Sequence, residues 1–295
     1  MGFERILFHT RFRETAFEAL TSLLALKAVG LKTVVLTYVI PREAVAFVPY
    51  GGYLKAEEDR IRQEAGARFA QWQKDLTARG IQSTVRIETG AANAELLRVA
   101  EEEQVDLIVT GSKKRTSFEK VYVGAHILDI LRRSPIPVMM GKYMVTYESD
   151  GERLTRVNDR LFERPMLASD WSDPAQRGLD ALVALGPLVE RALVVHVIGN
   201  KLASGRTSED LAALENESRQ RLAASCRRLT EAGLSAGCHL GRGKSAAEIV
   251  RLSRAHGASM IVMGRTGKDW FQEYFLGGVS HRVAEHSELP VMLVP

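Results

Sequence analysis

A glycine-containing segment near the C-terminus has the composition of an anion-binding loop. It reads VMGRTGKDWFQEYFLGGVSHRVAEH over residues 262–286, with Gly264 and Gly267 three residues apart and the pair Gly277 and Gly278 after nine further residues. Glycine lets a ligand approach the backbone closely. The apolar spacing after the glycine pair predicts a helix, whose free N–H groups and dipole would favour a phosphate. The residue types therefore indicate a phosphate-binding loop, with an ordinary surface loop as the alternative.

A second stretch, GRGKSAAEIV at 241–250, is similar to the end of a P-loop but lacks the required spacing. A P-loop needs glycine five residues before its Gly-Lys-Ser/Thr end. Cys238 stands at that place before Gly243. We therefore interpret the stretch as a strand-to-helix turn and predict that Ser245 caps a helix beginning near Ala246.

Other residues with chemical potential do not assemble into a recognisable site. Asp170 and Asp173 would suit a metal as paired carboxylates, but Asp173 followed by Pro174 is typical of a helix start, as N-cap or first-turn residue. Neither a Ser–His–Asp arrangement nor a nucleophile elbow occurs. Four aromatic residues of the loop spacer would either stack on a ligand or pack the loop onto its own domain: Trp270, Phe271, Tyr274 and Phe275. The histidines lack metal-ligand spacings, and we interpret them as core or surface residues: His9, His126, His196, His239, His256, His281 and His286.

The composition favours a cytoplasmic globular protein. The chain has 295 residues, 45% of them hydrophobic, and a net charge of +4. It has neither an arginine-rich run nor an aromatic-interleaved basic tract, so we expect no nucleic-acid partner. It lacks an apolar run of about 18 residues and a signal-peptide core, so we expect no membrane partner. Cys226 and Cys238 show neither metal-ligand nor redox spacing, which favours a reducing compartment.

The chain contains one pattern twice. Three pairs of segments match at a constant offset of 153 residues: 85–98 with 238–251, 105–111 with 258–264, and 134–140 with 287–293. A period of this length indicates two copies of a domain rather than a solenoid. We predict a first domain over 1–145, a polar and charged linker over 146–162, and a second domain over 163–295.

Each copy alternates short apolar, β-rich runs with helical patterns. In the first copy the strand-like runs are Ile6–Phe8, Val34–Val39, Val85–Ile87, Leu107–Val109 and Val138–Met140. This order predicts an α/β fold, with two tandem doubly wound domains that each contain a five-stranded parallel sheet flanked by helices. Ligands of such sheets bind at the carboxyl ends of the strands, near the topological switch point.

The glycine segment resembles the G-x2-G-x9-G-[S/T] signature of the nucleotide-binding branch of the universal stress protein family. The strand before it, MIVMG, and the chain end, SELPVMLVP, are also similar to that family. The resemblance covers both copies and therefore nearly the whole chain. It implies an adenine nucleotide alpha hydrolase-like fold, in which the two copies pair edge to edge, with pseudo-two-fold symmetry, through their last strands, PVMMGK and PVMLVP.

The resemblance also implies an adenine nucleotide (ATP, ADP or AMP, with or without Mg²⁺) in the second copy. Asp170 matches the family aspartate on the ribose and adenine side, Ala168 a wall of the adenine pocket, and Val197 the residue whose backbone meets adenine. Arg265 would contact phosphate or remain a solvated loop charge. The implied binding residues are Ala168, Asp170, Val197, Met263, Gly264, Arg265, Gly267, Gly277, Gly278, Val279 and Ser280.

Several positions depart from the family pattern. Gly278 stands where the family has a hydroxyl, and the loss of one side-chain donor implies an affinity roughly tenfold weaker. In the first copy, Arg11 replaces the aspartate, Lys114 the second glycine and Ala125 the final hydroxyl. We interpret the first copy as a degenerate structural half, with Lys114 contacting a phosphate as the alternative.

The function that the sequence and the resemblance together predict is that of a nucleotide-dependent regulatory or protective protein in stress response. Its expected partners are an adenine nucleotide and an unidentified protein, with the two domains paired within one chain and a further homodimer left open. Two alternatives remain. One is an interaction or dimerisation module without nucleotide, and the other is a slow ATPase, although no positioned base or metal-ligand set supports turnover.

Overall fold

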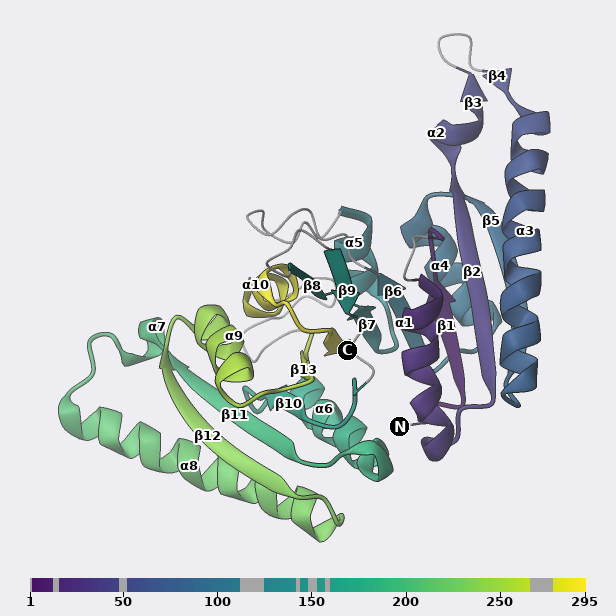
Figure 1. Ribbon diagram of the computed structural model, residues 1–295. Coiled ribbons are helices and arrows are strands. Elements are labelled where there is room, and N and C mark those ends of the chain that lie inside the picture. The colour runs from purple at the N-terminus through teal and green to yellow at the C-terminus, as the bar shows by residue number, and fades with distance from the viewer. Residues whose placement is uncertain are drawn as a thin grey trace.

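The two copies share one continuous ten-stranded sheet (Figure 1). The computed structural model describes residues 2–12, 16–47, 52–111, 125–141, 144–147, 153–156, 160–265 and 278–295. The strand order is β12-β11-β10-β13-β14-β7-β6-β1-β2-β5. Neighbouring strands are parallel within each half, and only the central pair β14 and β7 is antiparallel. The predicted α/β fold with two doubly wound halves is confirmed.

Within its described residues, the first half supplies five strands and four longer helices to the fold. Its strands in the large sheet are β1 (Arg5–His9), β2 (Thr33–Pro41), β5 (Gln82–Gly90), β6 (Leu107–Gly111) and β7 (Val138–Gly141). Its longer helices are α1 (Ala16–Leu23), α3 (Lys55–Ala78), α4 (Ala92–Glu102) and α5 (Ala125–Arg133). Smaller elements follow β2 and α1: the short helix α2 (Arg42–Val45), a hairpin of β3 (Ala46–Phe47) and β4 (Gly52–Tyr53), and the 3-10 turn η1 (Leu24–Val29).

The second half repeats this arrangement. Its strands are β10 (Pro165–Ala168), β11 (Ala192–Gly199), β12 (Ala236–Gly243), β13 (Met260–Gly264) and β14 (Val291–Val294). Its helices are α6 (Asp173–Ala184), the short α7 (Asn200–Ala203), α8 (Ser208–Glu231), α9 (Ser245–Ala255) and α10 (Gly278–His286), with the 3-10 turn η2 (Gly186–Leu188) after α6. The chain runs from β10 outward to β12 and then returns to β13 on the other side of β10. The switch point of this half therefore lies between β10 and β13.

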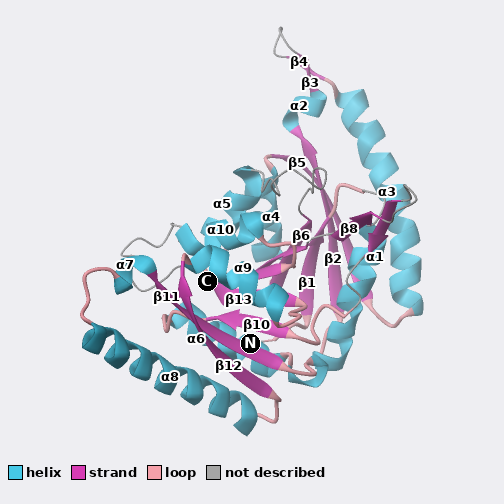
Figure 2. Cartoon of the chain, turned by 60° about the vertical axis from the view of Figure 1, so that its left-hand side comes forward, coloured by secondary structure: helices cyan, strands magenta, loops and turns pink. Residues whose placement is uncertain are grey.

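Buried apolar side chains form a layer on each face of the sheet. One layer includes Leu20 of α1, Phe69 of α3, Leu179 of α6 and Leu222 of α8. The other holds residues of α4, α5, α9 and α10, among them Leu96, Ile130, Ile249 and Val283. Figure 2 shows the result in the second half, where α8 lies on one side of β11 and β12 and α9 and α10 on the other. None of the helices within the described residues is long and apolar enough to cross a membrane.

The halves join through the last strand of each copy, as the family resemblance implies. Met292 of β14 lies opposite Met139 of β7 in antiparallel register, and both residues are buried. The join places two strands that would otherwise be exposed edges in the middle of the sheet, which protects them from pairing with other chains. Between the halves, β8 (Met144–Tyr147) pairs with β9 (Arg153–Arg156) as a short antiparallel hairpin, which begins two residues before the range predicted as a linker.

Helix starts follow the sequence in part. Asp173 and Pro174 lie in the first turn of α6, as expected, but the N-cap is Ser172, whose hydroxyl accepts the N–H of Ala175. The prediction that Ser245 is a cap is wrong. Lys244 occupies the N-cap of α9 without a side-chain hydrogen bond, and Ser245 is already the first helical residue.

A disulfide joins Cys226 of α8 to Cys238 of β12, with Cα atoms 6.4 Å apart. The spacing of twelve residues did not indicate this pairing. It arises because the chain turns back after α8 and β12 then runs along that helix. The bond ties the helix to the outermost strand of the second half.

Candidate functional site

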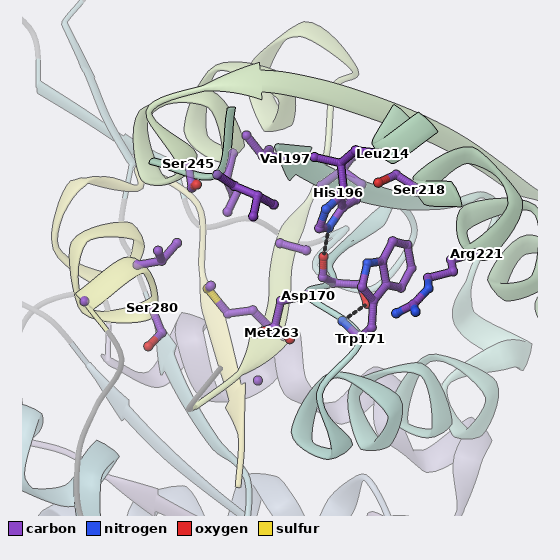
Figure 3. Close-up of a pocket in the computed structure, with 18 of the residues that line it drawn as sticks. Asp170, Trp171, His196, Val197, Leu214, Ser218, Arg221, Ser245, Met263 and Ser280 are labelled. Atoms are coloured by element: carbon purple, nitrogen blue, oxygen red, sulfur yellow. Dashed lines mark hydrogen bonds between the residues drawn. The ribbon is translucent and has the colours of Figure 1, made fainter. Parts of the chain in front are cut away.

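A cavity of about 510 Å³ lies at the carboxyl ends of β10, β11 and β13 (Figure 3). This is the switch point of the second half, where doubly wound sheets bind ligands. α8 forms one wall, and α9 and α10 form the other. The cavity brings together eight of the predicted binding residues: Ala168, Asp170, Val197, Met263, Gly264, Gly278, Val279 and Ser280. Two others, Gly267 and Gly277, lie outside the described residues.

Asp170 is held in a fixed orientation at the cavity. It follows β10 directly, and its Oδ1 accepts hydrogen bonds from the N–H of Ser172 at 3.1 Å and from the hydroxyl of Ser172 at 2.5 Å. The preceding Ser169 is tied to the sheet through its N–H, which donates to the carbonyl of Val195. The carboxylate is therefore preorganised by its own turn, which reduces the entropy that a ligand contact would cost.

Trp171 and His196 form an aromatic pair on the same side of the cavity. Their rings stack with centroids 4.7 Å apart. Trp171 adopts φ 69°, which is rare for a bulky residue, and its N–H donates to the hydroxyl of Ser169 at 3.3 Å. His196 Nδ1 lies 2.7 Å from the carbonyl oxygen of Ser169 and must carry the proton there, since a carbonyl only accepts. The sequence did not lead us to either residue, although they adjoin Asp170 and Val197 in the chain.

One face of α8 completes the cavity. It contributes Leu214, Glu217, Ser218 and Arg221, which recur at helical spacing. Arg221 Nη2 lies 2.7 Å from Glu217 Oε1, so the wall carries an ion pair. This wall was not predicted, because its residues lie within a helix and not in a segment that directly follows a strand. Their spacing marks one face of a helix, but mostly polar side chains at this spacing are equally typical of a solvent-exposed face, so the sequence carries no specific signal for this wall.

The α10 end of the cavity has the properties of an anion site. α10 begins at Gly278, so the N–H groups of its first turn lack intrahelical partners. A Cβ on Gly278 would meet open space, whereas a Cβ on Gly264 would lie 2.9 Å from Pro174 Cβ and 3.1 Å from the N of Ala175. Gly264 is therefore required by its close contact with the start of α6, and Gly278 is free of such a constraint. The Ser280 hydroxyl donates to the carbonyl of Arg265 at 2.8 Å, so its proton is used within the protein.

Arg265 is not among the residues that line the cavity, and its side chain reaches the first half. Its Nη1 donates to the carbonyl oxygen of Ser134 in the first half at 2.5 Å. Its main-chain N–H donates to the carbonyl of Val294 at 2.7 Å. The guanidinium therefore extends toward the other copy.

The strand registers identify the first-half counterparts of these residues. His9 pairs with Thr37 and Thr110 just as Ala168 pairs with Val195 and Met263. Arg11 therefore takes the place of Asp170, as the sequence predicted. Lys114 lies outside the described residues, and Ala125 begins α5.

Aromatic and polar side chains occupy this region of the first half. Phe12, the counterpart of Trp171, also has positive φ, and its ring lies 4.7 Å from Phe69 and 5.2 Å from Tyr38. His9 is buried with Nδ1 3.2 Å from Thr110 Oγ1. Burial and the nearby charge of Arg11 lower the pKa of His9 to about 3, so its ring is neutral at physiological pH. This packing favours the interpretation of a degenerate half.

Metal binding receives no support from side-chain clusters. In the ranges that the structure describes, no group of three or more His, Cys, Asp or Glu side chains is placed to hold a metal ion.

Comparison with known proteins assigns the chain to a family. The model of the universal stress protein family matches residues 2–142 and again 162–295. The universal stress protein MJ0577 of Methanocaldococcus jannaschii is 26% identical over 154 residues, 48% of this chain and 95% of that protein. The universal stress protein YxiE of Bacillus subtilis is 27% identical over 147 residues, 45% of this chain and 99% of that protein.

Solved structures agree on the fold over the entire chain. A universal stress protein from Archaeoglobus fulgidus superposes with a TM-score of 0.71 at 21% identity, covering 99% of this chain and 96% of that one. Another from Pseudomonas aeruginosa gives a TM-score of 0.67 at 14% identity, covering 99% and 93%. The universal stress protein family supports a role in stress response. Because the family model matches both halves and solved members share the architecture, the chain is a tandem member of this family.

Proposed function

We propose that the second half binds an adenine nucleotide, ATP, ADP or AMP, and that the chain acts as a nucleotide-dependent regulatory or protective protein in stress response. The observation that carries the proposal is the single cavity that unites Asp170, Val197 and the start of α10. These residues lie in three separate segments, and the family resemblance assigns them to ribose, adenine and phosphate.

The chemistry of the cavity suits the parts of such a ligand. Buried Ala168, Met263 and Ile249 offer an apolar surface for a planar base. The main chain at Val197, near the end of β11, offers peptide groups for the edge of the base. The preoriented carboxylate of Asp170 accepts hydroxyl hydrogen bonds from a ribose. The first turn of α10 supplies N–H groups and a positive dipole end for phosphates.

In this proposal the first half is a structural or regulatory partner. We infer domains over 1–145 and 163–295 with a linker over 146–162. An unidentified protein partner would respond to the occupancy of the second half, since a ligand shifts a conformational equilibrium only by binding its states unequally. A cytoplasmic location belongs to the same proposal. Thiol reductants would there oppose the Cys226–Cys238 disulfide.

The test is the nucleotide content of the purified chain. Denatured protein is separated by chromatography with mass detection, and its melting temperature is measured with and without millimolar ATP. We expect one adenine nucleotide per chain or a clear upward shift with ATP. Asp170→Ala should abolish both. Its internal counterpart Arg11→Ala is the matched control and should leave both unchanged.

A chain that releases no nucleotide and shows no ATP-dependent shift would contradict the proposal. The interaction-module alternative, which Gly278 and Arg11 favour, would then replace it. If Arg11→Ala lost nucleotide binding while Asp170→Ala retained it, the site would lie in the first half. That result would also contradict the proposal.

A further inference from the structure

Arg265, which directly follows β13 at the edge of the proposed nucleotide site, forms a hydrogen bond with the other half of the molecule. Arg265 follows Gly264, a residue of the cavity, and is the last described residue before the loop segment 266–277. Its Nη1 donates to the carbonyl oxygen of Ser134 at 2.5 Å, across 131 residues of sequence. Ser134 directly follows α5, whose last carbonyls lack intrahelical donors. The guanidinium supplies a donor there and its charge suits the negative end of the helix dipole.

The arginine end of the link is firmly placed. The N–H of Arg265 donates to Val294 of β14 at 2.7 Å, and its carbonyl accepts the hydroxyl of Ser280 at 2.8 Å. Ser280 is buried and lines the cavity from the first turn of α10. The main chain of Arg265 is therefore clamped between the sheet and the helix start that would receive phosphate.

The serine end is equally well placed. Ser134 is buried, and its hydroxyl donates to the carbonyl of Ile136 at 2.7 Å and accepts the N–H of the same residue at 3.3 Å. Its own N–H donates to the carbonyl of Ile130 at 2.9 Å. A bond between two such fixed points transmits a displacement of one end to the other.

The sequence repeat does not place a second arginine at the position equivalent to Arg265. The repeat relates Ser134 to Ser287, which makes the same turn, with its hydroxyl donating to Leu289 at 2.9 Å and accepting the N–H of that residue at 3.0 Å. The same offset relates Arg265 to Ser112, which carries no guanidinium and lies outside the described residues. The acceptor turn is thus present in both halves, whereas the arginine belongs only to the half with the proposed site.

We propose that Arg265 is a positioning residue that makes the first half part of the nucleotide site. It holds the chain directly after β13, at the edge of the cavity, against the end of α5, so that a ligand in the cavity changes the stability of α5 in the other half. The inference rests on the proposed function. A charge-assisted hydrogen bond of this kind corresponds to an effect of about tenfold or more in an equilibrium constant.

The experiment measures ATP affinity by calorimetry, and backbone hydrogen exchange with and without ATP, on the full chain. Arg265→Met removes the donors, Arg265→Lys retains a charged donor, and Arg282→Met removes an exposed arginine of α10 as the matched control. In the unaltered chain, ATP should slow exchange in both α10 and α5. Arg265→Met should bind ATP about tenfold more weakly and, at saturation, protect α10 without protecting α5. Arg265→Lys should restore part of the α5 response, and Arg282→Met should match the unaltered chain.

The inference is overturned if Arg265→Met binds ATP with unchanged affinity and still protects α5. Its failure is distinguishable from that of the proposed function through the ligand-free measurement. Without nucleotide, Arg265→Met should already exchange faster than Arg282→Met at the end of α5. Equal rates there would refute the anchor even in a chain that bound no ATP, while absence of ATP binding alone would refute the proposed function.

Discussion

Phe12 and Trp171 occupy the same place in the two halves, each two residues beyond a matching serine or threonine and each at positive φ, 51° and 69°. The N–H of Phe12 donates to the hydroxyl of Thr10, as that of Trp171 does to Ser169. Phe12 lies among the rings of Phe69 and Trp72, whereas Trp171 stacks on His196 beside a cavity. One turn therefore supports a packed site in one half and an open site in the other.

The two glycines of the cavity should respond oppositely to substitution. Gly278→Ser adds a hydroxyl in open space at the start of α10, and we expect it to raise ATP affinity about tenfold because a donor to phosphate is gained. Gly264→Ala places a methyl group against Pro174 and should lower both affinity and stability. Calorimetric titration and thermal melts measure both effects. Weaker binding by Gly278→Ser would contradict the assignment of α10 as the phosphate end.

The Trp171 ring should contribute to binding in a way that its counterpart does not. Trp171→Ala removes an aromatic face from the cavity wall, and we expect ATP affinity to fall by roughly three- to tenfold, the range of a stacking interaction. Phe12→Ala should lower the melting temperature, because it opens the packed aromatic group, while ATP affinity stays unchanged. Titration of the two variants in parallel is the measurement. Equal losses of affinity would show a general effect on folding.

The stability of the first half should depend on pH through His9. Its pKa is lowered to about 3 in the folded state, so the unfolded chain binds a proton first as the pH falls below about 6.5. The free energy of unfolding that neutral, buried His9 contributes is therefore lost progressively as the pH falls from about 6.5 to about 3. Between pH 7 and pH 5 this loss should be roughly 2 kcal/mol.

The variant His9→Ala copies the residue of the second half and isolates this contribution. Urea unfolding at pH 7 and pH 5 should show a smaller loss of stability in the variant than in the unaltered chain. The quantity to compare is the stability lost between pH 7 and pH 5 in each chain, not the stability at either pH. This comparison is needed because burial also lowers the pKa of His239, which is present in both chains. An identical pH change in both chains would contradict a buried neutral His9.

The disulfide should stabilise the second half without being required for its fold. The disulfide joins two residues that are twelve positions apart in the sequence. Its reduction by a dithiol removes this cross-link from the unfolded chain, and we expect the free energy of unfolding to fall by about 3 kcal/mol. After reduction, the Cys238 thiol could donate a hydrogen bond to the carbonyl oxygen of Leu222, which lies 3.0 Å from its sulfur. Urea unfolding with and without reductant measures the change, and Cys226→Ser is the control that reductant should not affect. Equal stability of all samples would show that the bond does not form in solution.

Elements whose signals are local were predictable from the sequence. The strands alternate with helices in the expected order, and the constant offset identifies the repeat because equivalent buried strands need similar apolar runs. The pairing of β14 with β7 came from the family resemblance. Asp173 was placed correctly in a first helical turn, while Ser172 took the cap, since one residue of shift does not change the local pattern.

Features that depend on distant segments were not predictable. The α8 wall reaches the cavity only after the chain has crossed from β11, so Glu217 and Arg221 carry no mark of the site in their own neighbourhood. The Cys226–Cys238 bond depends on how β12 returns along α8. The destination of Arg265 depends on the join between halves, which sets the position of Ser134. Each of these results from tertiary packing, which a pattern within one segment does not contain.

A crystal structure of the chain grown with ATP or ADP tests the proposed nucleotide site most directly. We predict nucleotide in the cavity of the second half, with the base between Ala168 and Val197, the ribose at Asp170 and the phosphates at the start of α10. We also predict that the Phe12 region of the first half holds none. An empty second cavity at saturating nucleotide, or nucleotide bound beside Arg11 instead, would contradict the proposed site.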